Sequence, residues 1–458
     1  MVHNLTRRSR LAAAAAVAVL SLSLPVLAAT TTTPEIAHLS ANVVAPSKEE
    51  LNPASPNAVS DHVLSLEKVS RPKGSSTNYL KALASGHGAT HIDDLYDYEF
   101  IATIEWDGTP VKVIIDTGSS DTWLIHSGFQ CFDADGINLP EANCTFGPTF
   151  NGTFQHGTLP DLSFNISYGS GEFVLGDFGR EDIQIAGINV YSQQVALVNR
   201  AFWIGDLVTS GLLGLAYPLL TSAFKANDPT TQVIYDSIFT TMIKEKLVSP
   251  VFSLACERNS SGGYLALGGL PPVKAGPLFG STPIRKLEIL NKTSMLTHYS
   301  FYTIVPDGYI YQGSDRWSGI GSSWWSNLFN WPHINTTQFP VIVDSGTTLL
   351  ILPTEMTKDI AGLFDPPAVL IASEGAYFAP CNAVVPEVSV VIGGVPFGIA
   401  AADLLLQGQT LPNDTSSCLV GFNDGGNGPF TLGDTFLNNV VAVFDVGASE
   451  MRFAQHHY

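Results

Sequence analysis

Two stretches of the sequence decide the fold: VIIDTGSS at residues 113–120 and VIVDSGTT at residues 341–348. Each is an apolar segment that ends in Asp, a hydroxyl residue and Gly. A glycine after such a strand lets the backbone turn sharply and place amide and hydroxyl donors around the carboxylate. A single Asp-Thr-Gly is an ordinary turn, but two copies in equivalent positions indicate an internally repeated protein.

A second repeat lies downstream of each stretch. The segment LLG at residues 212–214 follows the first stretch, and TLG at residues 431–433 follows the second. Together the repeats predict a pseudo-symmetric pair of β lobes with a site between them. Asp116 and Asp344 would then lie within hydrogen-bonding range, where two carboxylates cannot both ionise cheaply and would share one proton.

A shared proton gives such a pair two complementary roles. The ionised carboxylate can accept a proton from a water molecule between the two groups, while the protonated one donates to a substrate carbonyl. This step yields a tetrahedral diol without a covalent bond to the protein. The sequence has no Gly-x-Ser-x-Gly, His-Glu-x-x-His, Cys-x-x-Cys or phosphate-binding Gly-Lys-Ser/Thr segment. We therefore expect neither a metal nor a cofactor.

Composition and patterning predict an all-β fold. Only 14% of the 458 residues are charged, and the chain is rich in residues that favour strands and turns over helices. From about residue 96 onward, short alternating segments are separated by Gly, Pro and Asn turns. The exception is the segment 231–246, where apolar residues recur at helical spacing, so we expect a helix there.

The N-terminal region predicts a precursor. Residues 1–28 contain a basic stretch, an apolar run and small residues at the cleavage positions, as a secretory signal peptide does. Residues 29–90 are poor in aromatics and rich in proline, and they carry Lys68 in an otherwise acidic protein. We expect a detachable pro-segment that docks by charge attraction at neutral pH and is released when carboxylates protonate; a disordered linker is the alternative. Residues 91–270 and 271–458 would form the N-terminal and C-terminal lobes.

Charge and hydropathy exclude several classes of partner. The formal net charge of −19 at pH 7 disfavours nucleic acid and anionic membranes. No later apolar run reaches the roughly 18 uninterrupted residues of a membrane span, and the C-terminus lacks a hydrophobic anchor signal. We therefore expect a freely soluble product without a membrane anchor. Seven Asn-x-Ser/Thr acceptors beyond residue 90 favour a secreted eukaryotic glycoprotein: Asn143, Asn151, Asn165, Asn259, Asn291, Asn335 and Asn413.

The five cysteines suggest two local disulfides and one buried thiol. The economical pairing joins Cys131 to Cys144 and Cys381 to Cys418, because each pair brackets a loop. Closing such loops contributes roughly 3 to 4 kcal/mol in the chain-entropy model. Cys256 lies in an apolar run, where a structural thiol is expected in place of a nucleophile.

Four separated motifs resemble those of the pepsin family of aspartic proteases (peptidase family A1), and the match runs from about residue 96 to the C-terminus. The motifs DTGSSDTW at 116–123 and DSGTT at 344–348 resemble the two catalytic turns. The motifs LLGLAYP at 212–218 and LGDTFL at 432–437 resemble the apolar segments behind them. The resemblance implies a bilobal fold of two β-barrel lobes with the active-site cleft between them. It also implies an endopeptidase that hydrolyses protein or peptide substrates in acid, with its own pro-segment as intramolecular inhibitor.

The resemblance assigns roles to individual residues. Asp116 and Asp344 would be the catalytic dyad, and SYGSG at residues 167–171 would be a flap that closes over the substrate. The flap Tyr168 would hydrogen-bond Trp123, while Ser119 and Thr347 would hydrogen-bond the outer carboxylate oxygens. The remaining expected flap and supporting residues are Gly169, Ser170, Gly171, Thr117, Gly118, Ser345 and Gly346.

Specificity and location are less narrowly determined by the sequence. Some fungal relatives that accept Lys before the cleaved bond have Asp between the flap glycines, where this chain has Ser170. We therefore expect large apolar residues around the scissile bond, although Glu172 lies just outside the flap tip. The aromatic segment 314–338 would pack over the second lobe or shape the cleft. The product is expected to be a fungal-type secreted monomer, with the vacuolar lumen as the alternative location and a non-catalytic binding protein as the rival function.

Overall fold

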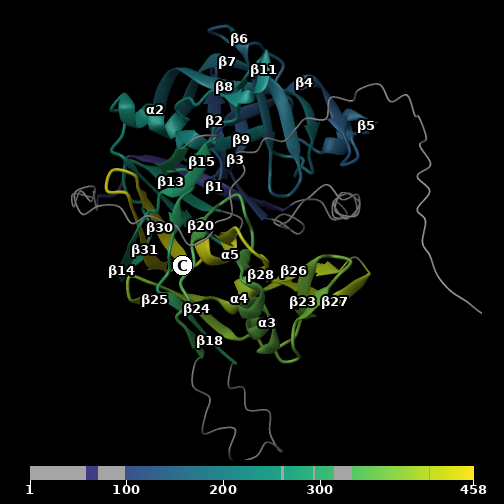
Figure 1. Cartoon of the computed structure of the whole chain (residues 1–458), viewed down its shortest axis with the longest axis vertical. Coiled ribbons are helices and arrows are strands. Elements are labelled where there is room, and N and C mark those ends of the chain that lie inside the picture. Colours follow the sequence, from purple (N-terminus) through teal and green to yellow (C-terminus); the bar gives the residue numbers. More distant parts are fainter. Residues whose placement is uncertain are drawn as a thin grey trace, which may run out of the picture. The chain divides into compact units, whose positions relative to one another are not determined.

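The computed structural model describes residues 58–70, 98–258, 262–291, 294–313, 333–411 and 413–457 (Figure 1). All of them belong to one unit, residues 33–458. The predicted signal peptide, most of the pro-segment, the maturation region and most of the aromatic segment 314–338 lie outside the described residues. None of the helices in the described part of the chain is long and apolar enough to cross a membrane.

The described chain is built mainly from strands, as the sequence predicts. Its largest sheet has 16 strands. Their order is β11 (Asp228–Gln232), β10 (Ala223–Lys225), β6 (Thr158–Ser167), β7 (Phe173–Ile185), β8 (Ile188–Phe202), β4 (Thr122–Phe132), β9 (Gly211–Gly214), β3 (Thr109–Asp116), β2 (Tyr98–Trp106), β1 (His62–Ser70), β13 (Gly263–Leu267), β12 (Val251–Cys256), β30 (Val440–Asp445), β31 (Glu450–His456) and β14 (Ala275–Pro283), with β5 (Asn138–Leu139) beside β4.

The C-terminal half adds smaller sheets. A five-stranded sheet has the order β17 (Thr303–Ile304), β20 (Val341–Val343), β29 (Phe430–Leu432), β21 (Leu350–Leu352) and β28 (Phe422–Asp424). Two four-stranded sheets are formed by β19 (His333–Asn335), β18 (Gly308–Gln312), β24 (Glu387–Ile392) and β25 (Val395–Ile399), and by β22 (Val369–Ile371), β23 (Ala376–Pro380), β27 (Asp414–Val420) and β26 (Leu405–Leu411). A hairpin joins β15 (Leu287–Asn291) and β16 (Ser294–His298).

Helices are short. Among the described residues they are α2 (Ile238–Lys244), α3 (Thr354–Gly362), α4 (Ala401–Leu404) and α5 (Asp434–Leu437), with two 3-10 turns at Glu141–Cys144 and Pro218–Leu220. The helix expected over 231–246 is therefore shorter than predicted. Thr231 and Gln232 belong to β11, where the main chain pairs with β10, and only Ile238, Met242 and their neighbours form the buried helical face.

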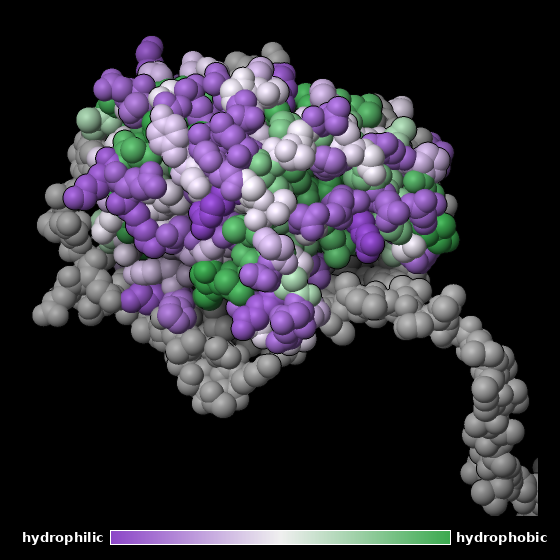
Figure 2. All heavy atoms as spheres, turned by 90° about the horizontal axis from the view of Figure 1, so that it is seen from above, coloured by the Kyte–Doolittle hydropathy of each residue, from purple (hydrophilic) through white to green (hydrophobic). Residues whose placement is uncertain are grey.

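Apolar side chains fill the interior of these sheets. The largest fully buried side chains include Trp106, Trp123 and Phe252. Along β24 buried and more exposed residues alternate, as expected for a strand with one face against the core. Figure 2 shows hydrophilic residues over much of the face drawn, interrupted by smaller apolar groups.

The repeat predicted from the sequence is visible in the strand pairing. In the N-terminal half β9 runs parallel to β3 and antiparallel to β4. In the C-terminal half β29 runs parallel to β20 and antiparallel to β21. The LLG and TLG segments thus lie directly beside the strands that end in the two Asp turns. This confirms a two-lobed, mostly β architecture with internal repetition.

A group of strands connects the two halves. We call β1, β13, β12, β30, β31 and β14 the shared sheet, which lies between the upper and lower groups of strands in Figure 1. Because β12 pairs with β30, the shared sheet crosses the expected lobe boundary at residue 270. Strand β1 lies within the expected pro-segment, yet it pairs with β2 on one side and β13 on the other, and its Leu66 is buried.

Both predicted disulfides are confirmed. Cys131 is bonded to Cys144 and Cys381 to Cys418. The fifth cysteine, Cys256, is buried in β12 outside both disulfides, and burial raises the pKa of its thiol well above the usual value. A thiol held in its protonated form is a poor nucleophile, so its placement fits a structural residue.

Candidate active site

The ends of β3 and β20 bring Asp116 and Asp344 together. The glycine two residues after each Asp lies against the carboxyl group of the opposite lobe. A Cβ atom built on Gly118 would lie 2.5 Å from both carboxylate oxygens of Asp344. A Cβ atom on Gly346 would lie 2.7 Å from Oδ1 of Asp116. Only a residue without a side chain fits at either position, which explains the Asp-x-Gly pattern of both turns.

Each carboxylate accepts hydrogen bonds from its own turn. Oδ1 of Asp116 accepts from the amide of Gly118 at 2.7 Å, and Oδ2 accepts from the hydroxyl of Ser119. Oδ1 of Asp344 accepts from the amide of Gly346 at 2.9 Å, and Oδ2 accepts from the hydroxyl of Thr347 at 2.8 Å. The two halves of the molecule therefore hold their acidic groups by the same set of donors.

Hydrogen bonds between the lobes tie the two turns to each other. The hydroxyl of Thr117 donates to the carbonyl of Val343 at 3.1 Å and accepts from the amide of Ser345 at 3.0 Å. The hydroxyl of Ser345 donates to the carbonyl of Ile115 at 2.8 Å and accepts from the amide of Thr117 at 3.2 Å. Because all four bonds are buried, they fix the relative position of the two carboxyl groups.

Burial and mutual proximity change the acidity of the pair. Burial raises the pKa of Asp116, and the neighbouring Asp344 raises it further, while the hydrogen bonds from Ser119 and Gly118 lower it. Burial also raises the pKa of Asp344, against the hydrogen bonds from Gly346 and Thr347. Two carboxyl groups this close keep one proton between them over a wide pH range.

The motifs behind the turns hold them by main-chain bonds. The amides of Leu215 and Ala216 donate to the carbonyls of Asp116 and Ser119, both at 2.8 Å. In the other lobe the amide of Asp434 donates to the carbonyl of Thr347 at 2.8 Å. The repeated apolar-Gly segments thus support the two turns in the same way.

The hairpin of β6 and β7 carries the expected flap. Its strands pair up to Ser167 and Phe173, and the turn between them contains Gly171 with a φ of 89°, a left-handed conformation that favours glycine. The indole Nε1 of Trp123 donates to the hydroxyl of Tyr168 at 2.9 Å. The Tyr168 ring also packs edge-on against Trp203, at 5.5 Å between ring centroids.

Glu172, which the sequence places just outside the flap tip, is buried in the structure. Its carboxylate accepts from the hydroxyl of Ser170 at 2.9 Å and from the amide of Ile204 at 2.5 Å. The amide of Tyr168 donates to its main-chain carbonyl at 2.9 Å. Glu172 therefore fastens the flap tip to the segment after β8 instead of projecting outward.

A small cavity of about 40 Å³ lies between the two acidic turns and the flap. This volume holds a few water molecules. The cavity is lined by Tyr98, Glu99, Ile114, Asp116, Tyr168, Glu172, Trp203, Leu212, Ser345, Gly346 and Thr348. Sequence reasoning assigned no role to Glu99 or Trp203, because their own sequence neighbourhoods resemble no motif.

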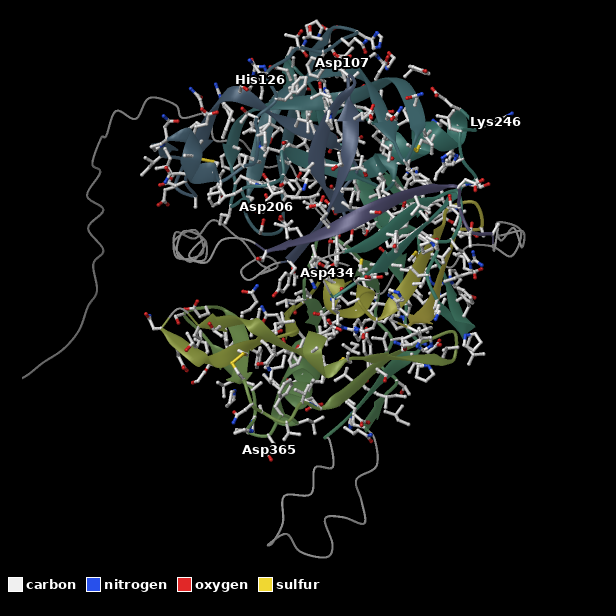
Figure 3. The ribbon with its side chains drawn as sticks, turned by 180° about the vertical axis from the view of Figure 1, so that it is seen from behind. Asp107, His126, Asp206, Lys246, Asp365 and Asp434 are labelled. Atoms are coloured by element: carbon white, nitrogen blue, oxygen red, sulfur yellow. A yellow bond between two sulfur atoms is a disulfide. The ribbon has the colours of Figure 1, made fainter. Side chains whose placement is uncertain are left out.

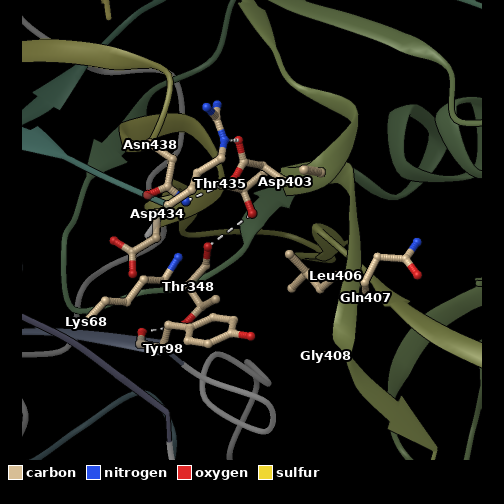
Figure 4. Close-up of a pocket in the computed structure, with 12 residues that line it drawn as sticks. Lys68, Tyr98, Thr348, Asp403, Leu406, Gln407, Gly408, Asp434, Thr435 and Asn438 are labelled. Carbon is tan, nitrogen blue, oxygen red and sulfur yellow. Dashed lines mark hydrogen bonds and ion pairs between the residues drawn. The ribbon is translucent and has the colours of Figure 1, made fainter. Parts of the chain in front are cut away.

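A larger cavity of about 240 Å³ lies where β1 meets α4 and α5 (Figure 4). The ammonium of Lys68 in β1 lies 4.3 Å from the ring centroid of Tyr98. Burial lowers the pKa of Lys68, and the nearby Asp434 and Asp403 raise it. Figure 3, which views the molecule from behind, shows Asp434 close to β1. The half-buried Lys68 of the expected pro-segment thus lies near carboxyl groups of the C-terminal lobe.

The other predicted sites are dispersed. Asn143, Asn151 and Asn413 are exposed, whereas Asn165 in β6 and Asn335 in β19 are half-buried. Asn259 and the side chain of Asn291 lie outside the described residues. Within the described ranges no group of His, Cys, Asp and Glu side chains is arranged to hold a metal ion.

Comparisons with known proteins agree with this geometry. The family model for eukaryotic aspartyl proteases matches residues 99–456. The chain is 37% identical over 415 residues to a protein of Aspergillus fumigatus named probable aspartic-type endopeptidase, covering 88% of this chain and 89% of the relative. Penicillopepsin-2 of Penicillium janthinellum is 26% identical, with 82% of each chain covered. The crystal structure of an aspartic proteinase from Irpex lacteus has the same fold, with a TM-score of 0.56 at 17% identity, covering 86% of this chain and 98% of that one.

Proposed function

The chain belongs to the eukaryotic aspartyl protease family and is an aspartic-type endopeptidase, and on that premise we propose that Asp116 and Asp344 hydrolyse peptide bonds as a dyad. The observation that carries this proposal is the approach of the two carboxyl groups, each against the glycine of the opposite turn. Such a pair holds one proton and needs no covalent intermediate.

In the first step the ionised carboxylate takes a proton from the attacking water, whose oxygen bonds to the peptide carbon. The protonated carboxyl group gives its proton to the peptide oxygen, so a neutral diol forms and the dyad is charged as before. In the second step the protonated carboxyl group gives its proton to the amide nitrogen, the ionised one takes a proton from a diol hydroxyl, and the C–N bond breaks, which leaves the dyad with one proton again. Ser119 and Thr347 hold the outer oxygens in place during both steps.

The pH limits of the dyad follow from the one-proton requirement. Activity is lost at high pH, where the shared proton leaves, and at low pH, where both groups are protonated. Because burial raises the pKa of both carboxyl groups, the shared proton stays bound well above the usual carboxyl range, and the precursor's need for acid comes from release of its pro-segment. Substrate preference for large apolar residues is supported by Ile114, Leu212 and Trp203 in the cavity wall.

We also propose that the chain is made as a secreted zymogen. Residues 1–28 would direct export, and Asn143, Asn151 and Asn413 are the accessible glycosylation candidates among the described residues. Strand β1 of the pro-segment completes the shared sheet between β2 and β13 and places Lys68 near Asp434. Cleavage near residue 90 would leave β1 held by non-covalent contacts alone, among them the attraction between Lys68 and the carboxylates of Asp434 and Asp403. Protonation of these carboxylates in acid would weaken that attraction and favour release.

The purified precursor tests the proposed function directly. We expect cleavage of an unfolded protein substrate in acid and none near neutrality, over a series from about pH 2 to about pH 8. Pepstatin should block cleavage, and a shorter chain that starts near residue 90 should appear before or with activity. Absence of cleavage after confirmed loss of the pro-segment would point to a binding protein that has kept the fold.

A further inference from the structure

Asp121 is a buried carboxylate in the first catalytic turn that takes no part in the steps described above. It lies between β3 and β4, five residues after Asp116, and its side chain is 0% exposed. Its oxygens accept from the amide of Ser222 at 3.1 and 3.0 Å, and Oδ1 accepts from the hydroxyl of Tyr235 at 2.6 Å. Both donors come from segments far from Asp121 in the sequence.

The first donor leads to the first strand of the flap hairpin. Ser222 directly precedes β10, which pairs with β6 from Ala223 opposite Phe164 onward. The carbonyl of Ser222 also accepts from the amide of Asn165 in β6 at 3.3 Å. Ser222 is therefore bound to Asp121 through its amide and to the flap strand through its carbonyl.

The second donor leads to the second strand of the hairpin. The ring of Tyr235 packs edge-on against Phe178 of β7, at 5.4 Å between centroids. Phe178 in turn packs against Phe164 of β6 at 5.3 Å. The carboxylate of Asp121 thus joins the catalytic turn to both strands at the base of the flap.

We propose that Asp121 is a positioning residue that fixes the base of the flap hairpin to the first catalytic turn. Tyr168 at the tip of the hairpin is thereby held in the correct position over Asp116. The inference rests on the proposed function, and it adds a second attachment between the flap hairpin and the first catalytic turn. The first attachment is at the tip, where Trp123, two residues after Asp121, donates to Tyr168 at 2.9 Å.

The presence of a carboxyl group at this position supports a role in holding hydrogen-bond donors in fixed positions. A buried carboxylate is costly unless its oxygens are hydrogen-bonded, and an apolar side chain would fill the same space more cheaply. A carboxyl group has two oxygens on one rigid plane, and here both accept hydrogen bonds, from the amide of Ser222 and the hydroxyl of Tyr235. One such group can therefore hold two donors from separate segments in a fixed geometry.

The test compares Asp121→Asn, Asp121→Ala and Tyr235→Phe with wild type, with active sites counted by pepstatin titration. Asn keeps an oxygen acceptor and Ala keeps none, so we expect kcat/KM to fall about 10-fold in Asp121→Asn and about 100-fold in Asp121→Ala. The loss of kcat/KM in Tyr235→Phe should be closer to that in Asp121→Asn. Asp445→Asn is the control, because Asp445 is also buried and accepts an amide bond from Ala448, but lies in the shared sheet. It should lower thermal stability and leave kcat/KM per active site unchanged.

A double-mutant cycle separates positioning from a general loss of stability. If Asp121 acts through the flap, Asp121→Asn should change kcat/KM less than about 2-fold once Tyr168→Phe has already weakened flap closure. Full additivity, or a loss confined to melting temperature with kcat/KM unchanged, would overturn the inference and leave the proposed function standing. Failure of the wild-type precursor to cleave any substrate after processing would instead overturn both.

Discussion

Ser119 and Thr347 set the balance between the charged and neutral forms of the catalytic carboxyl groups. Each hydroxyl donates to the outer oxygen of its own Asp, and this bond lowers the pKa that burial raises. The family resemblance implied this contact for both residues, each of which lies three positions after its Asp. The contact is local to one turn, so sequence could indicate it without knowledge of the tertiary structure.

Removing one of these hydroxyls is expected to slow catalysis and shift its pH dependence. Ser119→Ala should raise the pKa of Asp116 further and lower kcat/KM by about 10- to 100-fold, because a carboxylate with fewer donors is harder to ionise and less well held. The kcat/KM profile measured against pH checks this, with the acidic limb moving to higher pH. Ser120→Ala is the matched control, since that hydroxyl donates to the carbonyl of Tyr217. An unmoved profile for Ser119→Ala would contradict the assignment.

The glycines of the two turns give a second expectation at the scale of single residues. Gly118→Ala would place a methyl group 2.5 Å from the Asp344 oxygens, so the two carboxyl groups must separate. We expect kcat to fall by at least about 100-fold in a folded protein. Gly362→Ala, at the end of α3, is the control, because a Cβ there meets nothing within 4 Å. Equal activity of the two variants would show that the carboxyl groups are farther apart than described.

At the scale of elements, the flap depends on contacts that its own sequence does not contain. The hairpin turn was predictable from its glycines, and the Tyr168–Trp123 bond from the family resemblance. The burial of Glu172 could not be predicted from the sequence, because it depends on the amide of Ile204 in a distant segment. The role of β1 was missed for the same reason, since its partners β2 and β13 are distant in sequence. The helix expected over 231–246 exists but is shorter than predicted, because Thr231 and Gln232 pair with β10 as part of β11.

The hydrogen bond at the flap tip makes a prediction for this hairpin. Trp123→Phe keeps an aromatic ring but removes the Nε1 donor to Tyr168 together with part of the buried indole, and we expect kcat/KM to fall about 10-fold in the folded protein. Steady-state kinetics on an oligopeptide, with circular dichroism for folding, measures this. Trp106→Phe is the control, because its indole nitrogen is buried with no hydrogen-bond partner among the described residues. A similar loss in both variants would indicate that ring volume, and not the hydrogen bond, matters.

At the scale of the whole molecule, buried acidic groups make stability depend on pH in the opposite direction from an ordinary salt-bridged protein. Burial raises the pKa of Asp121 from 3.8 to about 6, and the pKa values of Asp116, Asp344 and Glu181 are also raised. The folded state therefore binds more protons than the unfolded chain above about pH 4. This contribution to stability is fully present below about pH 4 and is lost as the pH rises through the folded-state values.

The shift at Asp121 alone corresponds to about 3 kcal/mol. We expect the melting temperature to fall by at least about 5 °C between pH 4 and pH 7, and the net negative charge should add to the loss. Differential scanning calorimetry on the processed enzyme, inhibited to prevent self-digestion, measures the change. Asp121→Asn should flatten the curve, because that side chain no longer titrates. A melting temperature that rises toward neutral pH would contradict this account.

The central claim is that Asp116 and Asp344 act as one unit, and the kinetics of Asp116→Asn, Asp344→Asn and the double variant test it most directly. Groups that act together are strongly non-additive, so each single substitution should abolish peptide hydrolysis about as completely as both together. All three proteins should still fold and keep both disulfides. Losses that multiply in the double variant, or substantial activity in either single variant, would contradict the shared-proton dyad.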